Sequence, residues 1–180
     1  MEEFIERFNG LIAILENIRI PAPQLREIKS NPRFNPQLKP RPFQLFLECF
    51  EWYLFLPLIP GGIYGPFYRI DGDHFWPQDS DGISPFSEIK YFYGLKKPAN
   101  QKEAMEKYKM MPDTPKDYVH EFAIDSKAIG DTRDAAIFLG PVKGGSGYQF
   151  NANKSTANII RSLIIKGKIA TEELKKGLIK

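Results

Sequence analysis

Cysteine and histidine are scarce in this chain of 180 residues, and their scarcity excludes two kinds of site. Cys49 is the only cysteine, so an internal disulfide and a cysteine-rich metal centre are both ruled out. The chain has two histidines, His74 and His120, which argues against zinc held by several histidines. We therefore expect no bound metal.

The chain also lacks a strong charge of either sign and a long apolar run. Its net charge of +3 is too small to indicate nucleic acid as a partner. The most apolar stretch, residues 43–59, is interrupted by Glu48, Glu51 and Pro57 and is too short for a membrane span. The N-terminus lacks the basic and apolar regions of a secretory signal. We expect no nucleic-acid partner and no membrane span.

Apolar spacing and prolines organise the N-terminal region. Apolar residues recur every three or four positions from Phe4 to Ile18, which predicts a helix. Prolines crowd residues 19–42 and predict an extended connector, and apolar spacing over residues 43–56 predicts a second helix. We expect residues 1–59 to form a helical and extended accessory segment.

Short β-prone runs follow, separated by Gly, Pro, Asp and Ser. They predict an α+β fold with a compact, twisted antiparallel β-sheet core, N-terminal helices and a C-terminal helix. We expect residues 60–180 to form a second domain. One helix, over residues 100–110, interrupts the predicted strands, which cover residues 63–70, 88–93, 118–124, 135–139 and 148–151.

Helix signals return near the C-terminus. Ser155 or Thr156 can cap a helix that ends at Gly167. A last short helix is predicted from Thr171 to Gly177, because acidic residues occupy its first turn. The core face of the longer helix is predicted to consist of Ile159, Ile160, Leu163 and Ile164.

The segment GPVKGGSGYQF, residues 140–150, admits two interpretations. In the first it is a hairpin, in which Gly144, Gly145 and Gly147 supply positive φ angles. In the second the glycines let the backbone approach a ligand, and Gln149 is presented with both a donor and an acceptor. A phosphate-binding loop that opens a helix is excluded, because strand-like residues follow the glycines.

Two further groups of residues have the composition of a site. The aspartates from Asp71 to Asp81 suggest a calcium loop, but a glycine follows Asp71 directly and no glutamate stands at the twelfth position. His74 and His120 are each open to two interpretations, as a general acid or base or as a histidine packed for structural reasons.

The order of four segments resembles the TNT family, the tuberculosis-necrotizing-toxin-type NAD glycohydrolase domains of bacterial toxins and fungal surface enzymes. The GGxGxQ run followed by a helix is the most specific part of the resemblance. The matching segments are FYRIDGDHFWP (67–77), DYVHEFAID (117–125), FLGPVKGGSGYQF (138–150) and IIRSLIIKGKI (159–169).

The resemblance implies roles for individual residues. Gln149 corresponds to the catalytic glutamine of the family, and Arg69 to the arginine that holds the NAD phosphates. His120 corresponds, in an offset register, to a site histidine. The nucleotide would lie against a turn made of Gly144, Gly145 and Gly147.

One family feature differs here. Where the family has an arginine before a Leu-Pro-Pro run, this chain offers Lys90, Lys96 or Lys97. A lysine is a point charge and lacks the bidentate fork of arginine, so the phosphate contact differs at this place. Aromatic side chains that can stack on nicotinamide or adenine are Tyr68, Phe75 and Trp76.

The activity implied is hydrolysis of NAD(P)+, as substrate and without a further cofactor, to nicotinamide and ADP-ribose. Such a toxin would be secreted or delivered into a target cell and would be paired with an immunity protein. Three alternatives stay open. They are an ADP-ribosyltransferase with Glu121 as the nearby acid, a ribonuclease-type toxin using His74 and His120, and a binding module without enzymatic activity.

Overall fold

A computed structural model of the chain describes residues 2–30, 50–72, 92–129 and 135–177. In these residues four α-helices accompany a sheet of seven strands, which confirms the α+β class with N-terminal helices and a C-terminal helix. The helices are α1 (Glu2–Asn17), α2 (Ala22–Ser30), α3 (Gln101–Tyr108) and α4 (Lys154–Ile165), with a short 3-10 turn at Ser126–Ile129. The strands are β1 (Leu54–Pro57), β2 (Ile63–Asp71), β3 (Phe92–Gly94), β4 (Tyr118–Asp125), β5 (Ala136–Pro141), β6 (Tyr148–Ala152) and β7 (Ala170–Glu173).

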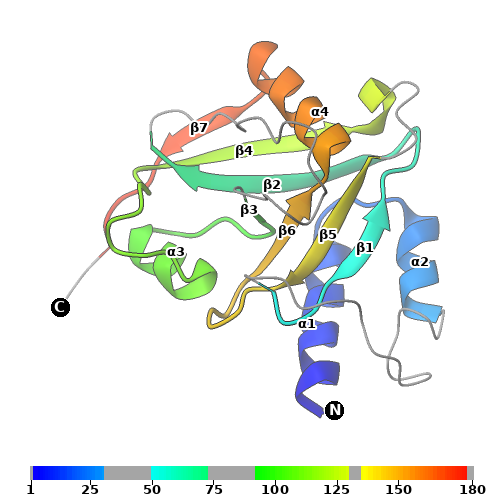
Figure 1. Cartoon of the computed structure of the whole chain (residues 1–180), viewed down its shortest axis with the longest axis horizontal. Coiled ribbons are helices and arrows are strands. Elements are labelled where there is room, and N and C mark those ends of the chain that lie inside the picture. Colours follow the sequence, from blue (N-terminus) through cyan, green and yellow to red (C-terminus); the bar gives the residue numbers. More distant parts are fainter. Residues whose placement is uncertain (1, 31–49, 73–91, 130–134, 178–180) are drawn as a thin grey trace.

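The strands form one twisted sheet in the order β1-β5-β6-β3-β2-β4-β7, and every pairing is antiparallel (Figure 1). Directly opposed residues project to the same face of a sheet, and neighbours along a strand project to opposite faces. One line of register partners crosses five strands and is called the central row below. It consists of Gly140, Gln149, Gly94, Tyr68 and Glu121.

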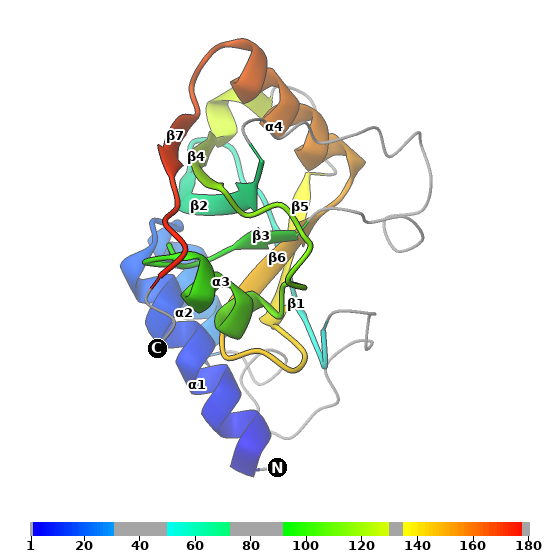
Figure 2. The same cartoon turned by 90° about the vertical axis from the view of Figure 1, so that its left-hand side faces the viewer.

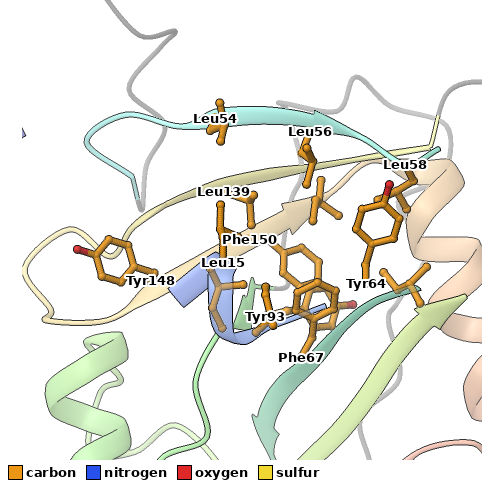
Figure 3. Packing of buried hydrophobic residues seen from close by; sticks show 14 of the residues in the cluster. Leu15, Leu54, Leu56, Leu58, Tyr64, Phe67, Tyr93, Leu139, Tyr148 and Phe150 are labelled. Atoms are coloured by element: carbon orange, nitrogen blue, oxygen red, sulfur yellow. The ribbon is translucent and has the colours of Figure 1, made fainter. Parts of the chain in front are cut away.

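The main core lies on the face of the sheet opposite to that of the central row. Phe67, Tyr93 and Phe150 form its centre, with ring centroids 4.5 Å apart for Phe67 and Phe150 and 4.9 Å apart for Tyr93 and Phe150 (Figure 3). Helices α1 and α4 cover this face with their apolar sides, as predicted. Their buried apolar residues are Phe8, Leu11, Leu15, Ile159, Ile160 and Leu163, while the side chain of Ile164, also predicted for this face, lies outside the described part.

Helix α3 lies over the other face, close to β3 and β6 (Figure 2). It begins at Asn100, whose side chain accepts a hydrogen bond from the Glu103 amide at 2.9 Å. Its buried Ala104 packs with Tyr68, Ile70 and other apolar residues of β2 and β4. This smaller cluster is what holds α3 against the central row.

The prediction of an extended connector over residues 19–42 is wrong for its first part, which forms α2. Both prolines of this part lie at the helix start, where proline is tolerated because the first amides have no partner within the helix. The amides of Gln24 and Leu25 bind the Pro21 carbonyl instead, at 3.0 and 3.2 Å. Ile28 then enters the main core.

Two regions predicted as helix contain strands in the described residues. Residues 43–49 lie outside the described part, but Leu54–Pro57 pairs with β5, and alternate residues of this strand are buried. The predicted last helix is strand β7, because the edge of β4 offers backbone hydrogen bonds to Ala170–Glu173. In both cases pairing with a distant strand prevails over local helical spacing.

The cap of α4 also differs from the prediction. Asn153, and neither Ser155 nor Thr156, is the cap, since its side-chain oxygen accepts from the Thr156 amide at 3.1 Å. Thr156 instead exchanges two hydrogen bonds of 2.9 Å with the backbone of Ala136 in β5. The helix ends before Gly167, whose φ of 66° agrees with the predicted stop.

Residues on both sides of the predicted domain boundary share the main core. Leu15 of α1 and Leu54 of β1 belong to the same cluster as Phe150 of β6. The main core therefore continues across the predicted boundary between residues 59 and 60. In the described part of the chain, no helix has both the length and the apolar character needed to cross a bilayer.

Candidate functional site

A pocket of about 300 Å³ opens between the central row and the C-terminal end of α3. It brings together three residues that the sequence assigned to a site from two widely separated segments, namely Tyr68 and Arg69 of β2 and Gln149 of β6. The full lining is Tyr68, Arg69, Ile70, Gly94, Tyr108, Lys109, Met110, Val142, Lys143 and Gln149.

Gln149 stands in the central row between two glycines. A Cβ atom on Gly94 would lie 2.6 Å from the ring of Tyr108, and one on Gly140 would lie 2.3 Å from the carbonyl oxygen of Trp52. The two glycines therefore let other parts of the protein reach the sheet on either side of Gln149. Gln149 itself is buried and is only 5% exposed.

Two tyrosines form the polar part of the wall. The hydroxyl of Tyr108 donates to the Lys96 carbonyl and accepts from the Lys96 amide, and burial raises its pKa. Burial, the negative charge of Glu121 and a hydrogen bond to Glu121 raise the pKa of Tyr68 to about 12. Both side chains are neutral phenols at physiological pH, so Tyr68 donates to the Glu121 carboxylate.

Two lysines supply positive charge at one end of the pocket. Lys109 directly follows α3 and has φ 52° and ψ 38°, a left-handed conformation that costs a residue with a Cβ roughly 1–2 kcal/mol. Its side chain runs past Gly144, where a Cβ would meet its Cδ and Cε at 3.5 Å. Lys143 comes from the adjoining turn and lines the same pocket.

The glycine-rich segment is a hairpin turn between β5 and β6, as in the first of its two interpretations. Gly144 has φ 76°, but Gly145 and Gly147 serve close approach, since their Cβ atoms would lie 2.4 and 2.9 Å from the Lys107 carbonyl oxygen. The amide of Gly147 donates to that same oxygen at 2.9 Å. The turn thus binds the last carbonyls of α3, and its contact with a nucleotide stays a prediction.

Arg69 and His120 lie differently from Gln149. Arg69 follows Tyr68 in β2, so its side chain leaves the strand on the opposite face, where its Nη2 lies 3.1 Å from the Asp71 carboxylate. Arg69 lines the pocket from β2, but its guanidinium is directed toward Asp71.

His120 is the register partner of Arg69 and is 2% exposed. Its Nδ1 lies 2.8 Å from the Thr171 hydroxyl, and its Nε2 lies 3.0 Å from the Gly72 carbonyl oxygen. A carbonyl only accepts, so Nε2 carries a proton. These bonds join β7 to the end of β2 on the face away from Gln149.

The remaining predicted residues lie elsewhere. Lys97 pairs with Glu172 of β7, and Lys97 and Lys96 are not among the described residues that line the pocket. His74, Phe75, Trp76 and Lys90 lie outside the described residues.

Sequence reasoning missed seven lining residues: Ile70, Gly94, Tyr108, Lys109, Met110, Val142 and Lys143. A signal for two of them was present, since Lys109 lies in the last turn of the helix predicted over residues 100–110 and Lys143 interrupts the glycine turn. Nothing local shows that these two segments meet.

Within the described residues, no group of three or more His, Cys, Asp or Glu side chains is arranged to hold a metal ion. The pocket is lined instead by the amide of Gln149 and the ammonium groups of Lys109 and Lys143, which suit an organic anion. Comparisons with protein-family models, with curated proteins and with solved structures found no match for this chain.

Proposed function

We propose that the chain hydrolyses NAD(P)+ to nicotinamide and ADP-ribose or its phosphate, and that the pocket on the central row is the active site. One observation carries the proposal: Tyr68 and Gln149, chosen from separate segments of the sequence, line one pocket that also holds two lysines. We further propose that the chain acts as a toxin that depletes NAD in a target cell, and that it is paired with a cognate immunity protein.

The reaction needs few protein groups. The bond between the ribose and the nicotinamide nitrogen breaks with its electron pair going to the ring, and neutral nicotinamide leaves. The oxygen of water bonds to the resulting cationic ribose carbon, and one proton passes to solvent. The protein has to hold the phosphates, orient the ribose and admit water to one face.

The pocket residues suit these tasks. The amide of Gln149 orients the ribose or the water through hydrogen bonds, and its burial keeps that orientation fixed. Lys109 and Lys143 bind the diphosphate, a role that the resemblance assigns to Arg69. The guanidinium of Arg69 is paired with Asp71 on the face opposite to that of Gln149, so we do not assign the phosphates to it.

Transfer of ADP-ribose to a protein is the second candidate. Glu121, the acid that this reaction requires, is the register partner of Tyr68 in the neighbouring strand β4, and it is not one of the residues that line the pocket. A ribonuclease has less support, because the ring nitrogens of His120 bind Thr171 and the Gly72 carbonyl on the other face.

The test is to incubate the purified chain with NAD+ and to measure free nicotinamide and ADP-ribose. We expect hydrolysis by the wild type and a loss of at least about 100-fold in kcat for Gln149→Ala, the size typical for a group that acts in the transition state. Lys127→Ala, an exposed lysine on the 3-10 turn, is the matched control for Lys109→Ala.

Each other outcome has a definite meaning. If the wild type leaves NAD+ intact under all conditions, the proposed function is wrong. If NAD+ is consumed only when an acceptor protein is present, the chain is a transferase. If Arg69→Ala lowers kcat/KM more than Lys109→Ala does, the assignment of the phosphates to Lys109 is wrong.

A further inference from the structure

Gly94 leaves a gap in the central row, directly beside Gln149. It is the register partner of Gln149 in β6 and of Tyr68 in β2. A Cβ atom on Gly94 would lie 2.6 Å from both Cζ and the hydroxyl oxygen of Tyr108. The Tyr108 ring, which comes from the end of α3, therefore occupies the position that a side chain at residue 94 would take.

The ring limits the space on one side of Gln149. The Cβ atoms of register partners stand roughly 4.5–5.5 Å apart, so a ring at the position of residue 94 lies next to the Gln149 side chain. On the other side, the missing side chain of Gly140 leaves room for the Trp52 carbonyl oxygen. Gln149 and Tyr108 also line the same pocket.

The hydroxyl of Tyr108 is already engaged with the backbone. It donates its one proton to the Lys96 carbonyl and accepts from the Lys96 amide at 3.1 Å. Burial raises the pKa of this phenol, so it does not become a phenolate near neutral pH. The two bonds attach the ring to the backbone that continues β3 beyond Gly94, and they leave the ring as the part of Tyr108 that faces the site.

Building on the proposed function, we infer that Tyr108 is a positioning residue whose ring keeps the Gln149 carboxamide in the orientation that hydrolysis requires. An amide that orients the ribose or the water acts only while its geometry is maintained, and a misplacement of about 1 Å can lower a rate about 100-fold. The phosphates are assigned to Lys109 and Lys143, whose charges remain when the ring moves. Displacement of the ring should therefore lower kcat more than it raises KM.

Gly94→Ala tests this without altering Tyr108, because the added Cβ would displace the ring. We expect kcat for NAD+ to fall at least about tenfold and KM to change less than about threefold. Gly62→Ala is the matched control, since its Cβ would also lie 2.6 Å from a side-chain atom, Cγ of Pro21, and Gly62 does not line the pocket. This control should keep the kcat of the wild type.

Two substitutions of Tyr108 itself separate the ring from the hydroxyl. Tyr108→Phe keeps the ring, and its kcat should stay close to that of the wild type. Tyr108→Leu removes the ring, and it should lose kcat as Gly94→Ala does even if Gly94→Ala fails to fold. Circular dichroism melts show which variants are folded.

Three outcomes would overturn the inference and leave the proposed function standing. The first is a folded Gly94→Ala or Tyr108→Leu enzyme with the kcat of the wild type, while Gln149→Ala is inactive. The second is an equal loss of kcat in Gly94→Ala and Gly62→Ala. The third is a Tyr108→Phe enzyme as inactive as Gln149→Ala, because the hydroxyl would then act in place of the ring. If the wild type does not hydrolyse NAD+ at all, the proposed function fails first, and the inference fails with it.

Discussion

At the scale of single residues, the site depends on a backbone conformation that residues with a Cβ atom normally avoid. Lys109 adopts a left-handed conformation at the end of α3, where glycine is the usual residue. That conformation directs its side chain past Gly144 into the pocket. Strained residues of this kind concentrate at functional sites, which agrees with a role for Lys109 in ligand binding.

Lys109→Gly should therefore stabilise the fold while weakening the site. Removal of the Cβ relieves the left-handed conformation, and we expect the free energy of unfolding to rise by up to about 1 kcal/mol. Loss of the ammonium group should raise the KM for NAD+. Urea denaturation and steady-state kinetics measure the two effects.

Lys109→Ala separates these effects, since it removes the charge and keeps the strained backbone. Its KM should rise as in Lys109→Gly, but its stability should not exceed that of the wild type. An equal gain in stability for both variants would contradict the role of the backbone conformation.

At the scale of elements, the glycine turn and α3 form one unit. The amides of Ser146 and Gly147 bind the carbonyls of Glu106 and Lys107, at 3.2 and 2.9 Å. These bonds satisfy carbonyls that the end of a helix leaves without partners. The turn thus fixes where Lys109 and Tyr108 stand relative to Gln149.

Gly145→Ala should disturb this unit. Its Cβ would lie 2.4 Å from the Lys107 oxygen, a backbone atom that cannot yield without moving α3. We expect a loss of roughly 1–3 kcal/mol in the free energy of unfolding, as in overpacked sites, and a lower kcat/KM. Thermal unfolding monitored by circular dichroism measures the first quantity.

Gly72→Ala is the control for this prediction, because the nearest atom to its Cβ would be 3.9 Å away. That variant should keep nearly the stability of the wild type. A Gly145→Ala protein as stable as Gly72→Ala would show that the turn and α3 separate easily.

At the scale of the whole molecule, the helices before β1 complete the core of the sheet. Leu11 and Leu15 of α1 are fully buried in the main core, and Gln24 of α2 binds the Pro57 carbonyl and the Tyr64 hydroxyl at 2.6 Å each. Accessory segments with few contacts unfold separately, whereas segments that share a core unfold together.

Leu15→Ala should for this reason destabilise the entire chain. We expect a loss of about 2–5 kcal/mol, the usual range for a buried leucine, in a single unfolding transition. Urea unfolding followed by both tryptophan fluorescence and far-UV circular dichroism tests this. Two separate transitions, with only the first shifted by the mutation, would mean that α1 folds independently of the sheet.

Local spacing determined several elements of this fold by itself. The apolar residues of α1 and α4 recur with a period of 3.6, and the strands β2, β4, β5 and β6 are short β-prone runs bounded by turn residues. Neither signal, nor the glycine stop after α4, needs a distant partner. Gln149 and Tyr68 were found for a similar reason, since a glycine turn and an aromatic strand are visible in the sequence. The α+β class follows from these elements.

Only the tertiary structure decided the rest, because it depends on which distant segments meet. Leu54–Pro57 and Ala170–Glu173 are strands because β5 and β4 have edges to pair with. Because successive residues of a strand project to opposite faces, the side chain of Arg69 lies on the other face of the sheet from that of Tyr68. The contact between the glycine turn and α3 places Lys109 in the same pocket as Gln149. Hydrogen bonds and packing between segments far apart in the chain thus selected the members of the site.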